Sequence, residues 1–374
     1  MDSVKNIFHL GVKELFSLRR DVVLMALVAW AFTFSVYTAA TGMSHDLNNA
    51  ALAIVDEDRS PLSARIRHAF LPPYFAAPEM IAFAEIDPGM DSGAYTFVLV
   101  IPPRFEADML AGRQPSVQVN IDATAMMQAG IGDSYISSII AQEIATYLKA
   151  DSRSETPIRL EARYAFNPNI ESSWFTSVME IINNITMLAI VLTGAALIRE
   201  REHGTIEHLL VMPLTPFEIM MAKVWANGLV ILVATALSLS VVVEAVLQVP
   251  VAGSRLLFLG ATTLYLFFAT ALGIFLATLA RSMPQFGLLF ILVMLPMNML
   301  SGGETPTESQ PAWLQAAMQA VPSKHFVEIA QAILFRDAGL DVVWPQLVLV
   351  SVIGALFFAF AAARFRSSIA QMQG

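Results

Sequence analysis

Long apolar runs without a charged residue recur along this chain, and a polar stretch separates the first run from the others. A helix needs about 20 residues to cross the hydrocarbon core of a bilayer, which is about 30 Å thick. Runs of roughly this length occupy residues 22–44, 181–198, 224–243, 256–280, 282–303 and 342–363. The pattern therefore predicts a membrane all-α fold with six transmembrane helices.

Residues 1–21 precede the first run and have helical spacing. Val4, Ile7, Phe8, Leu15 and Leu18 share one face and polar residues cover the rest, which is typical of an amphipathic helix at a membrane interface. A secretory signal peptide also places basic residues before an apolar run, but its core has only about 7–15 residues. We therefore expect an uncleaved anchor.

Residues 45–172 are polar and mixed in pattern. Strand-like runs occur at 51–55, 95–101 and 117–121, and helical spacing occurs near 105–110 and at 134–149. This pattern predicts an α+β domain, inserted between spans 1 and 2, that is large enough to bury its own core.

The composition supports a polytopic membrane protein, because 56% of the residues are hydrophobic, 14% are charged and the mean hydropathy is +0.61. Almost all of the net charge of −9 lies in residues 45–173, which disfavours nucleic acid as a partner. Cysteine is absent, so disulfides and thiolate chemistry are excluded.

A charged island at residues 199–223 separates the second and third predicted spans. Residues that begin or end helices divide it: Gly204, Thr205, Pro213 and Pro216. Thr215 and Glu218 have the spacing of a capping box at the start of the next helix. The helix predicted at 206–212 is too short to be stable alone, so it must dock on another surface.

The string R-E-x-x-x-G-T-x-E-x-L-x-x-x-P-x-x-x-x-E-x-x-x-A-K resembles the first intracellular loop of type-2 ABC transporter permeases, in particular the drug-efflux branch. The resemblance implies a coupling helix that inserts into a separate ATPase subunit. It marks these residues for ATPase coupling: Glu200, Glu202, Gly204, Thr205, Glu207, Leu209, Leu210, Pro213, Glu218 and Lys223. From spacing alone, a connector that merely turns the chain is an equal alternative.

Residues 302–341 are neither fully polar nor a full span, and their prolines predict short re-entrant or interfacial helices. The segments L-S-G-G-E-T-P-T-E-S-Q-P-A-W-L-Q and V-P-S-K-H-F-V-E-I-A-Q resemble the C-terminal signature of the same family, although residues 308–310 are more polar than the family pattern. The resemblance covers residues 1–366. It implies a dimer of permease protomers, homodimeric or heterodimeric, with cytoplasmic ATPase subunits, and it places residues 45–172 in the periplasm.

Basic residues near the span ends predict the orientation, because they concentrate on the cytoplasmic side. One side has Lys13, Arg19, Arg20, Arg199, Arg201, Lys223, Arg281, Arg364 and Arg366, whereas the short opposite loops have Arg255, Lys324 and Arg336. We expect a multi-pass protein of the bacterial inner membrane with both termini cytoplasmic, including the tail at 367–374.

The chain lacks the motifs of an enzyme. None of its lysines follows a glycine, so it has no Walker A motif, and ATP and Mg²⁺ are expected in the partner ATPase rather than in this chain. His203 and His208 are five residues apart and point to different faces of a helix, which disfavours a metal site. We expect a permease subunit without catalytic residues or cofactors.

Polar and methionine residues within the spans are the candidates for a substrate cavity. These are Asn183, Asn184 and Met187 in the second span and Met294, Met297 and Asn298 in the fifth; ordinary packing is an equal alternative. Glu180 and Glu244 are possible intramembrane carboxylates, for which an interfacial position is favoured.

These patterns and the resemblance together indicate a five-span domain at residues 173–366 after the first span. They also indicate the permease of an ATP-driven exporter of drugs or other apolar or amphipathic compounds. A periplasmic adaptor and an outer-membrane channel are further expected partners. Two alternatives remain: a transducer that acts through the periplasmic domain without transport, and an ion-coupled carrier that uses Glu180 or Glu244. The substrate is not predicted, because a cavity lined by Met, Asn and Leu suits many molecules.

Overall fold

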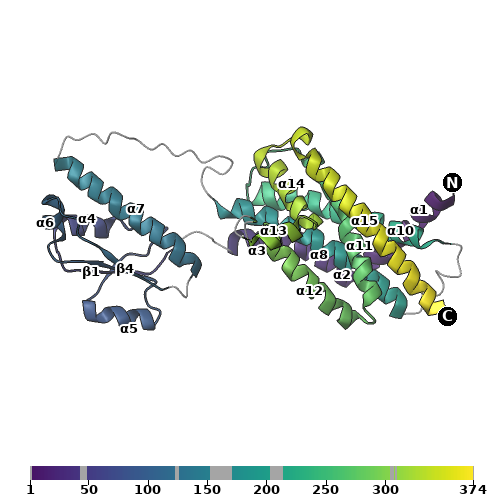
Figure 1. The fold of residues 1–374 in the computed structure, drawn as a ribbon, viewed down its shortest axis with the longest axis horizontal. Coiled ribbons are helices and arrows are strands. Elements are labelled where there is room, and N and C mark those ends of the chain that lie inside the picture. The colour runs from purple at the N-terminus through teal and green to yellow at the C-terminus, as the bar shows by residue number, and fades with distance from the viewer. Residues whose placement is uncertain are drawn as a thin grey trace. The chain divides into compact units, whose positions relative to one another are not determined.

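The computed structural model describes residues 2–42, 49–122, 126–151, 171–202, 214–303, 307 and 310–373. The chain divides into two compact units: unit 1 comprises Met1–Met43 with Ala165–Gly374, and unit 2 comprises Ser44–Tyr164. In unit 1, α1 (Asp2–Arg20) begins and α15 (Leu340–Gln373) finishes at the same end (Figure 1).

Six helices among the described residues are long and apolar enough to cross a membrane, as predicted. They are Val22–Gly42, Ser172–Glu202 (α8), Pro216–Val246, Arg255–Leu279 (α11), Met283–Leu300 (α12) and Leu340–Ser367 within α15. α8 extends beyond its charge-free run, and its 31 residues span about 46 Å. This is longer than the hydrocarbon core is thick, so its charged end can leave the core.

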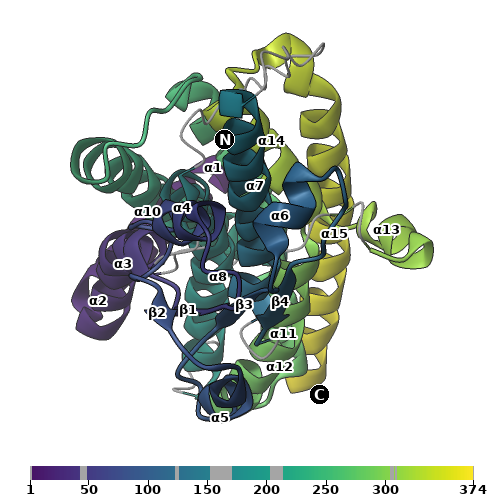
Figure 2. The same ribbon diagram turned by 90° about the vertical axis from the view of Figure 1, so that its left-hand side faces the viewer.

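α8 and α11 form the centre of unit 1. Most of the apolar stretch is buried in α8 (78%) and α11 (67%), against 17–33% in the other four spans. Figure 2 shows α11 beside α15, with α14 (Pro322–Arg336) against both. Because lipid is as apolar as a leucine side chain, close packing of small residues holds such helices together.

Two spans contain π-helical turns, which the hydrophobic pattern did not predict. η1 (Ala31–Ser35) separates α2 (Val22–Trp30) from α3 (Val36–Gly42), and η3 (Ser238–Val246) continues α10 (Pro216–Leu237). Asn184 of α8 donates from Nδ2 to the Ala31 carbonyl oxygen at 2.8 Å. A side chain from the neighbouring helix therefore supplies a hydrogen bond at one of these irregular turns.

The helices predicted in residues 302–341 are present as α13 (Ala312–Met318) and α14. Pro322 occupies the first turn of α14, where the missing amide hydrogen costs nothing. Phe326 of α14 stacks on Tyr265 of α11 with ring centroids 4.2 Å apart. α14 is therefore packed into the bundle, whereas Trp313 of α13 is exposed.

Unit 2 is a four-stranded sheet of order β2-β1-β3-β4 with helices on both faces (Figure 1). The strands are β1 (Leu52–Asp56), β2 (Glu79–Met80), β3 (Phe97–Ile101) and β4 (Gln118–Ile121); β1 is parallel to β2 and β3, and β4 is antiparallel to β3. One face carries α4 (Pro61–Ala69), α6 (Phe105–Leu110) and α7 (Met126–Asp151), and the other carries η2 (Phe83–Glu85) and α5 (Ile86–Asp91).

The side chains of β1 alternate between the two faces of this sheet. Leu52 and Ile54 belong to the core beneath α4 and α7, whereas Ala53 and Val55 pack with Ile86 of α5. This two-sided burial explains why β1 and β3 are nearly continuous apolar runs in the sequence. The predicted strands β1, β3 and β4 and the predicted helices α6 and α7 are confirmed, whereas β2, α4 and α5 were not predicted.

Candidate functional site

The charged end of unit 1 lies where α8 ends and α10 begins. Residues 203–213, between these helices, lie outside the described residues. Among the predicted coupling residues, this applies to Gly204, Thr205, Glu207, Leu209, Leu210 and Pro213. The described part of the site is therefore the base of the loop, formed by Glu200 and Glu202 on α8 and by Glu218 and Lys223 on α10.

Lys223 joins three helices through a buried ion-pair cluster. Its Nζ lies 2.9 Å from Glu200 Oε1 of α8 and 3.1 Å from Glu14 Oε1 of α1, and its side chain is 2% exposed. Burial opposes ionisation of Glu14, but the Lys223 ammonium outweighs this effect and lowers the pKa of the Glu14 carboxyl. One cation thus holds the two ends of the loop to the N-terminal helix.

The last turn of α8 is held by two arginines. Arg199 pairs with Asp21, which caps α2 by accepting from the Leu24 amide; this hydrogen bond and the guanidinium lower the pKa of Asp21. Arg201 donates from Nη1 to the Ala280 carbonyl at 2.6 Å and from Nη2 to Ala277 at 3.0 Å. The two hydrogen bonds from Arg201 satisfy carbonyls at the C-terminal end of α11 that have no helical donor.

Glu202 closes the base of the loop on the side of α12. Its Oε1 accepts from the Met283 backbone amide at 3.0 Å, at the N-terminus of that helix. The end of α8 is thus bound to α11 through Arg201, to α12 through Glu202 and to α1 through Glu200 and Lys223. A displacement of the loop must therefore move several helices.

The predicted capping box at the start of α10 is confirmed. The Glu218 amide donates to Thr215 Oγ1, and the Thr215 amide donates to Glu218 Oε2 at 2.7 Å. Glu218 is only 4% exposed, and its Oε1 also accepts from Asn6 Nδ2 of α1 at 3.2 Å. This predicted coupling residue therefore faces α1 rather than solvent.

α1 packs closely along α10. Phe8 stacks on Trp225 with centroids 5.8 Å apart, and Trp225 Nε1 donates to the Ile7 carbonyl at 3.0 Å. Gly11 lies against the same indole, where a Cβ atom would come within 2.1 Å of the ring. The sequence pattern predicted helix α1 but missed these contacts and Glu14. The signal that could have found Glu14 is Lys223, because a lysine in an apolar helix needs a carboxylate partner.

The cavity candidates on α8 do not share one face. Asn183 and Met187 are half-buried, whereas Asn184 is 3% exposed and donates to the Ala31 carbonyl and to Glu180 Oε1. Asn184 therefore points to η1 and away from Asn183, because successive helical residues diverge by about 100°. Glu180 also accepts from Ser35 Oγ at 2.5 Å.

On α12, Met294 and Met297 are buried in the core of unit 1 and Asn298 is half-buried. The two methionines thus pack inside the protomer, and the exposed side of α12 is formed by Leu288, Ile291, Leu292, Leu295 and Met299. Glu244 pairs with Arg255 at 2.7 Å, at the start of α11. Both candidate carboxylates, Glu180 and Glu244, therefore have partners within the chain.

Comparison with known proteins identifies the class to which this fold and this charged end belong. Residues 21–363 match a family described as ABC-2 family transporter protein. The chain belongs to this family: it is an ABC-2 type permease of an ABC transporter and a multi-pass inner membrane protein, and its class implies an ATPase partner.

Three relatives from Escherichia coli (strain K12) match nearly the whole chain. The inner membrane transport permease YhhJ is 55% identical over 373 residues, which is 100% of both chains. The probable multidrug ABC transporter permease YbhR is 28% identical over 363 residues, 96% of this chain and 97% of YbhR. The probable multidrug ABC transporter permease YbhS is 27% identical over 371 residues, 95% of each.

Proposed function

We propose that this permease exports drugs or other apolar and amphipathic compounds, and that residues 199–223 couple it to ATP hydrolysis in the partner ATPase. The observation that carries the proposal is the base of the loop, where Lys223 is buried between Glu14 and Glu200. Buried ion pairs resist separation, so a push on the loop moves α1, α8 and α10 together. The printed names of YbhR and YbhS support a multidrug substrate class.

In this proposal the coupling residues have two roles. Glu200, Glu202, Glu218 and Lys223 are bound within the protomer and fix the ends of the loop. The central residues, including Glu207, Leu209 and Leu210, contact the ATPase, as the short apolar helix in the sequence predicts. ATP and Mg²⁺ bind in the partner, and this chain supplies no catalytic residue.

Leu209→Asp is expected to abolish substrate-stimulated ATP hydrolysis in the reconstituted complex, because a carboxylate opposes docking into an apolar groove. Phe217→Asp is the matched control, because Phe217 lies outside the short helix and is 51% exposed. Thr215 is not used for this control, because its side chain caps α10. Membrane insertion of both variants should equal that of the wild type. Normal coupling in Leu209→Asp would contradict the proposed docking.

We propose that α1, the C-terminal end of α15 and the loop lie on the cytoplasmic side and that unit 2 is periplasmic. The basic residues of the loop support this orientation, because Arg199, Arg201 and Lys223 gather at the end where α1 packs. A cysteine at Ser92 should react with an impermeant maleimide in cells with a permeabilised outer membrane, and a cysteine at Thr215 should not. The reverse labelling would overturn the orientation.

We propose that two protomers meet around a cavity to which α8 and α12 contribute. The exposed apolar stripe of α12 and the half-buried Asn183 and Met187 are the surfaces available for this contact. Asn184, Met294 and Met297 are buried within the protomer, so they pack behind the wall of this cavity and do not line it.

Asn183→Ala and Met187→Ala are expected to change which compounds stimulate the partner ATPase, with thermal stability nearly unchanged. Asn184→Ala is the adjacent control: it should lower the free energy of unfolding by about 1–3 kcal/mol, because the Ala31 carbonyl and Glu180 lose a buried donor. An unaltered compound profile in the first two variants would exclude this face from the cavity.

The transducer alternative predicts ATP hydrolysis coupled to unit 2 without movement of a compound, so transport into inverted vesicles separates it from export. The ion-coupled carrier is disfavoured, because Glu180 is hydrogen-bonded to Ser35 and Asn184, and Glu244 is paired with Arg255.

We further propose a periplasmic adaptor and an outer-membrane channel as partners of unit 2. Co-purification from native membranes tests this composition.

A further inference from the structure

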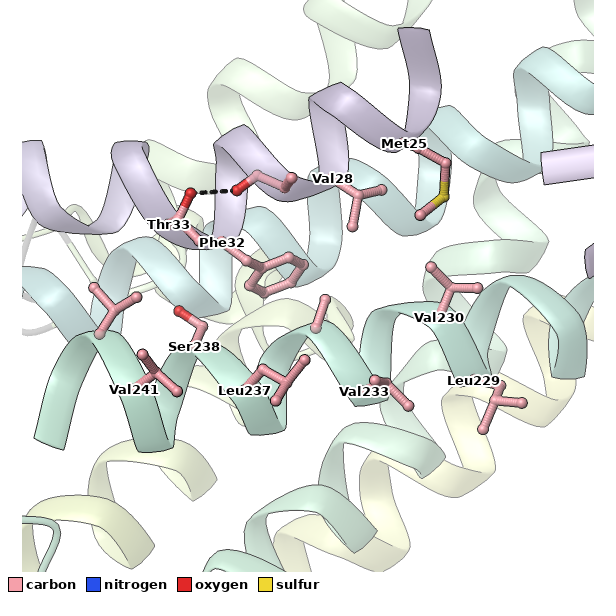
Figure 3. Close-up of a pocket in the computed structure, with 13 residues that line it drawn as sticks. Met25, Val28, Phe32, Thr33, Leu229, Val230, Val233, Leu237, Ser238 and Val241 are labelled. Carbon is pink, nitrogen blue, oxygen red and sulfur yellow. Dashed lines mark hydrogen bonds between the residues drawn. The ribbon is translucent and has the colours of Figure 1, made fainter. Parts of the chain in front are cut away.

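An apolar groove runs along unit 1 between α2–η1 and α10–η3, with a volume of about 590 Å³ (Figure 3). Val28 and Phe32 line one wall, and Val230, Val233 and Leu237 line the other. The hydroxyl of Thr33, at its edge, already donates to the Ala29 carbonyl. Leu229, Val233, Leu237 and Val241 are exposed, so the groove opens toward the lipid.

A second, polar cavity of about 370 Å³ lies at the charged end, between α1, α8 and α10. Lys13 and Arg199 bring positive charge to its wall, and Glu14 and Glu200 bring negative charge. Each carboxylate offers about four lone-pair sites, so the contacts with Lys223 leave acceptor capacity on the cavity side. The cavity thus presents both signs of charge within one small volume.

Asn227 of α10 lies two residues before Leu229, which is the first residue of that helix to line the groove. Asn227 lines the polar cavity, is 3% exposed, and its Nδ2 has no hydrogen-bond partner among the described residues. On α10, Asn227, Val230 and Ala234 recur at three and four residues, so they share one face, and Val230 and Ala234 line the groove. A buried amide without a partner is costly, which points to a ligand acceptor at this position.

We propose that the two cavities together bind one phospholipid whose headgroup carries a primary ammonium. The ammonium lies near Glu14 and Glu200, the phosphate near Lys13 and Arg199, and Asn227 donates to an ester carbonyl. One acyl chain occupies the groove. From Leu229 to Val242 the groove follows α10 for about 20 Å, comparable with the roughly 15 Å thickness of one hydrocarbon leaflet.

The charge pattern favours this lipid over other occupants. An anionic lipid such as phosphatidylglycerol has no ammonium to donate to the acceptor sites that Lys223 leaves on Glu14 and Glu200, and a fully apolar compound would leave the polar cavity and Asn227 unsatisfied. A quaternary ammonium has no N–H to donate to Glu14 or Glu200, whereas a primary ammonium has three donors. Phosphatidylethanolamine has the required chemistry, and phosphatidylcholine is its matched competitor.

The test is native mass spectrometry of the purified full-length chain after equilibration with equal amounts of dioleoyl phosphatidylethanolamine and dioleoyl phosphatidylcholine. Wild type should retain one phosphatidylethanolamine at least tenfold more often than phosphatidylcholine. Asn227→Leu and Val233→Trp should largely abolish retention of phosphatidylethanolamine, the first by removing the donor to the ester carbonyl and the second by filling the groove from its rim. Val348→Trp on α15 is the control, since Val348 is 52% and Val233 51% exposed.

Retention of phosphatidylethanolamine by Val233→Trp at the wild-type level would overturn the groove as the acyl site. Equal retention of both lipids by wild type would overturn the headgroup assignment, as would a preference for dioleoyl phosphatidylglycerol in a parallel competition. Since Asn227→Leu removes a buried amide and does not depend on the groove, agreement between it and Val233→Trp locates one lipid across both cavities. Loss of the preference in Val348→Trp would also contradict the proposal.

Discussion

Lys223→Met is expected to lower the free energy of unfolding by about 3–5 kcal/mol, because it leaves Glu14 and Glu200 facing each other without their shared cation. Methionine keeps most of the lysine volume, so the loss comes from electrostatics rather than from a cavity. A denaturant titration of the detergent-solubilised protein measures this change, and size-exclusion chromatography reports whether the variant is folded before the titration.

The control for this variant removes all three charges. Lys223→Met with Glu14→Gln and Glu200→Gln should recover most of the stability, since replacing a whole buried ion cluster is often nearly neutral. If the cluster also transmits force, the triple variant should be stable but show weaker ATPase stimulation in the complex. A Lys223→Met variant within 0.5 kcal/mol of wild type would contradict the structural role of the cluster.

Glu14 contributes to the pH dependence of stability through its lowered pKa. A carboxyl whose pKa is lower in the folded than in the unfolded state contributes stability above its unfolded value of about 4.3. That contribution is lost as the pH falls through the lower value of the folded state. The stability that Glu14 contributes should therefore persist below the usual pKa range of glutamate, and Glu14→Gln should remove this contribution from the pH profile of unfolding.

The sequence predicts the elements of this fold because local patterns determine them. Six charge-free runs are long enough to span a bilayer, and Thr215 with Glu218 three residues later is a local signal for the start of α10. The strands of unit 2 are similarly visible as short apolar runs. In each of these cases the stabilising contacts lie within one turn, one strand or one span.

Pairings between distant residues account for what the sequence did not predict. Glu14 and Lys223 are 209 residues apart, and nothing in the amphipathic pattern of α1 identifies Glu14 as the partner. Asn183 and Asn184 are adjacent amides, yet only Asn184 faces η1, because the rotation of α8 is fixed by its packing on α11. Likewise, Met294 and Met297 have a spacing that fits a cavity or a core equally well.

Gly273→Val is expected to prevent the close packing of α11 on α8 and to lower the free energy of unfolding by about 3 kcal/mol or more. A Cβ atom at Gly273 would lie 2.5 Å from the Ile190 carbonyl oxygen and 2.2 Å from Thr193 Oγ1. The backbone of α8 cannot retreat without breaking the Thr193 hydroxyl contact to the Thr270 carbonyl. The two most buried spans would therefore have to separate.

Gly260→Val provides the matched control, because Gly260 is on the same helix and an added Cβ atom there meets nothing within 4 Å. Valine has a slightly better helix propensity than glycine, so this variant should be as stable as wild type or more stable by a few tenths of a kcal/mol. Thermal unfolding of both purified variants, followed by tryptophan fluorescence, measures the difference. Equal melting temperatures for the two variants would show that α8 and α11 are not in the close contact that Gly273 and Thr193 define, and the central pair of the bundle would have to be packed differently.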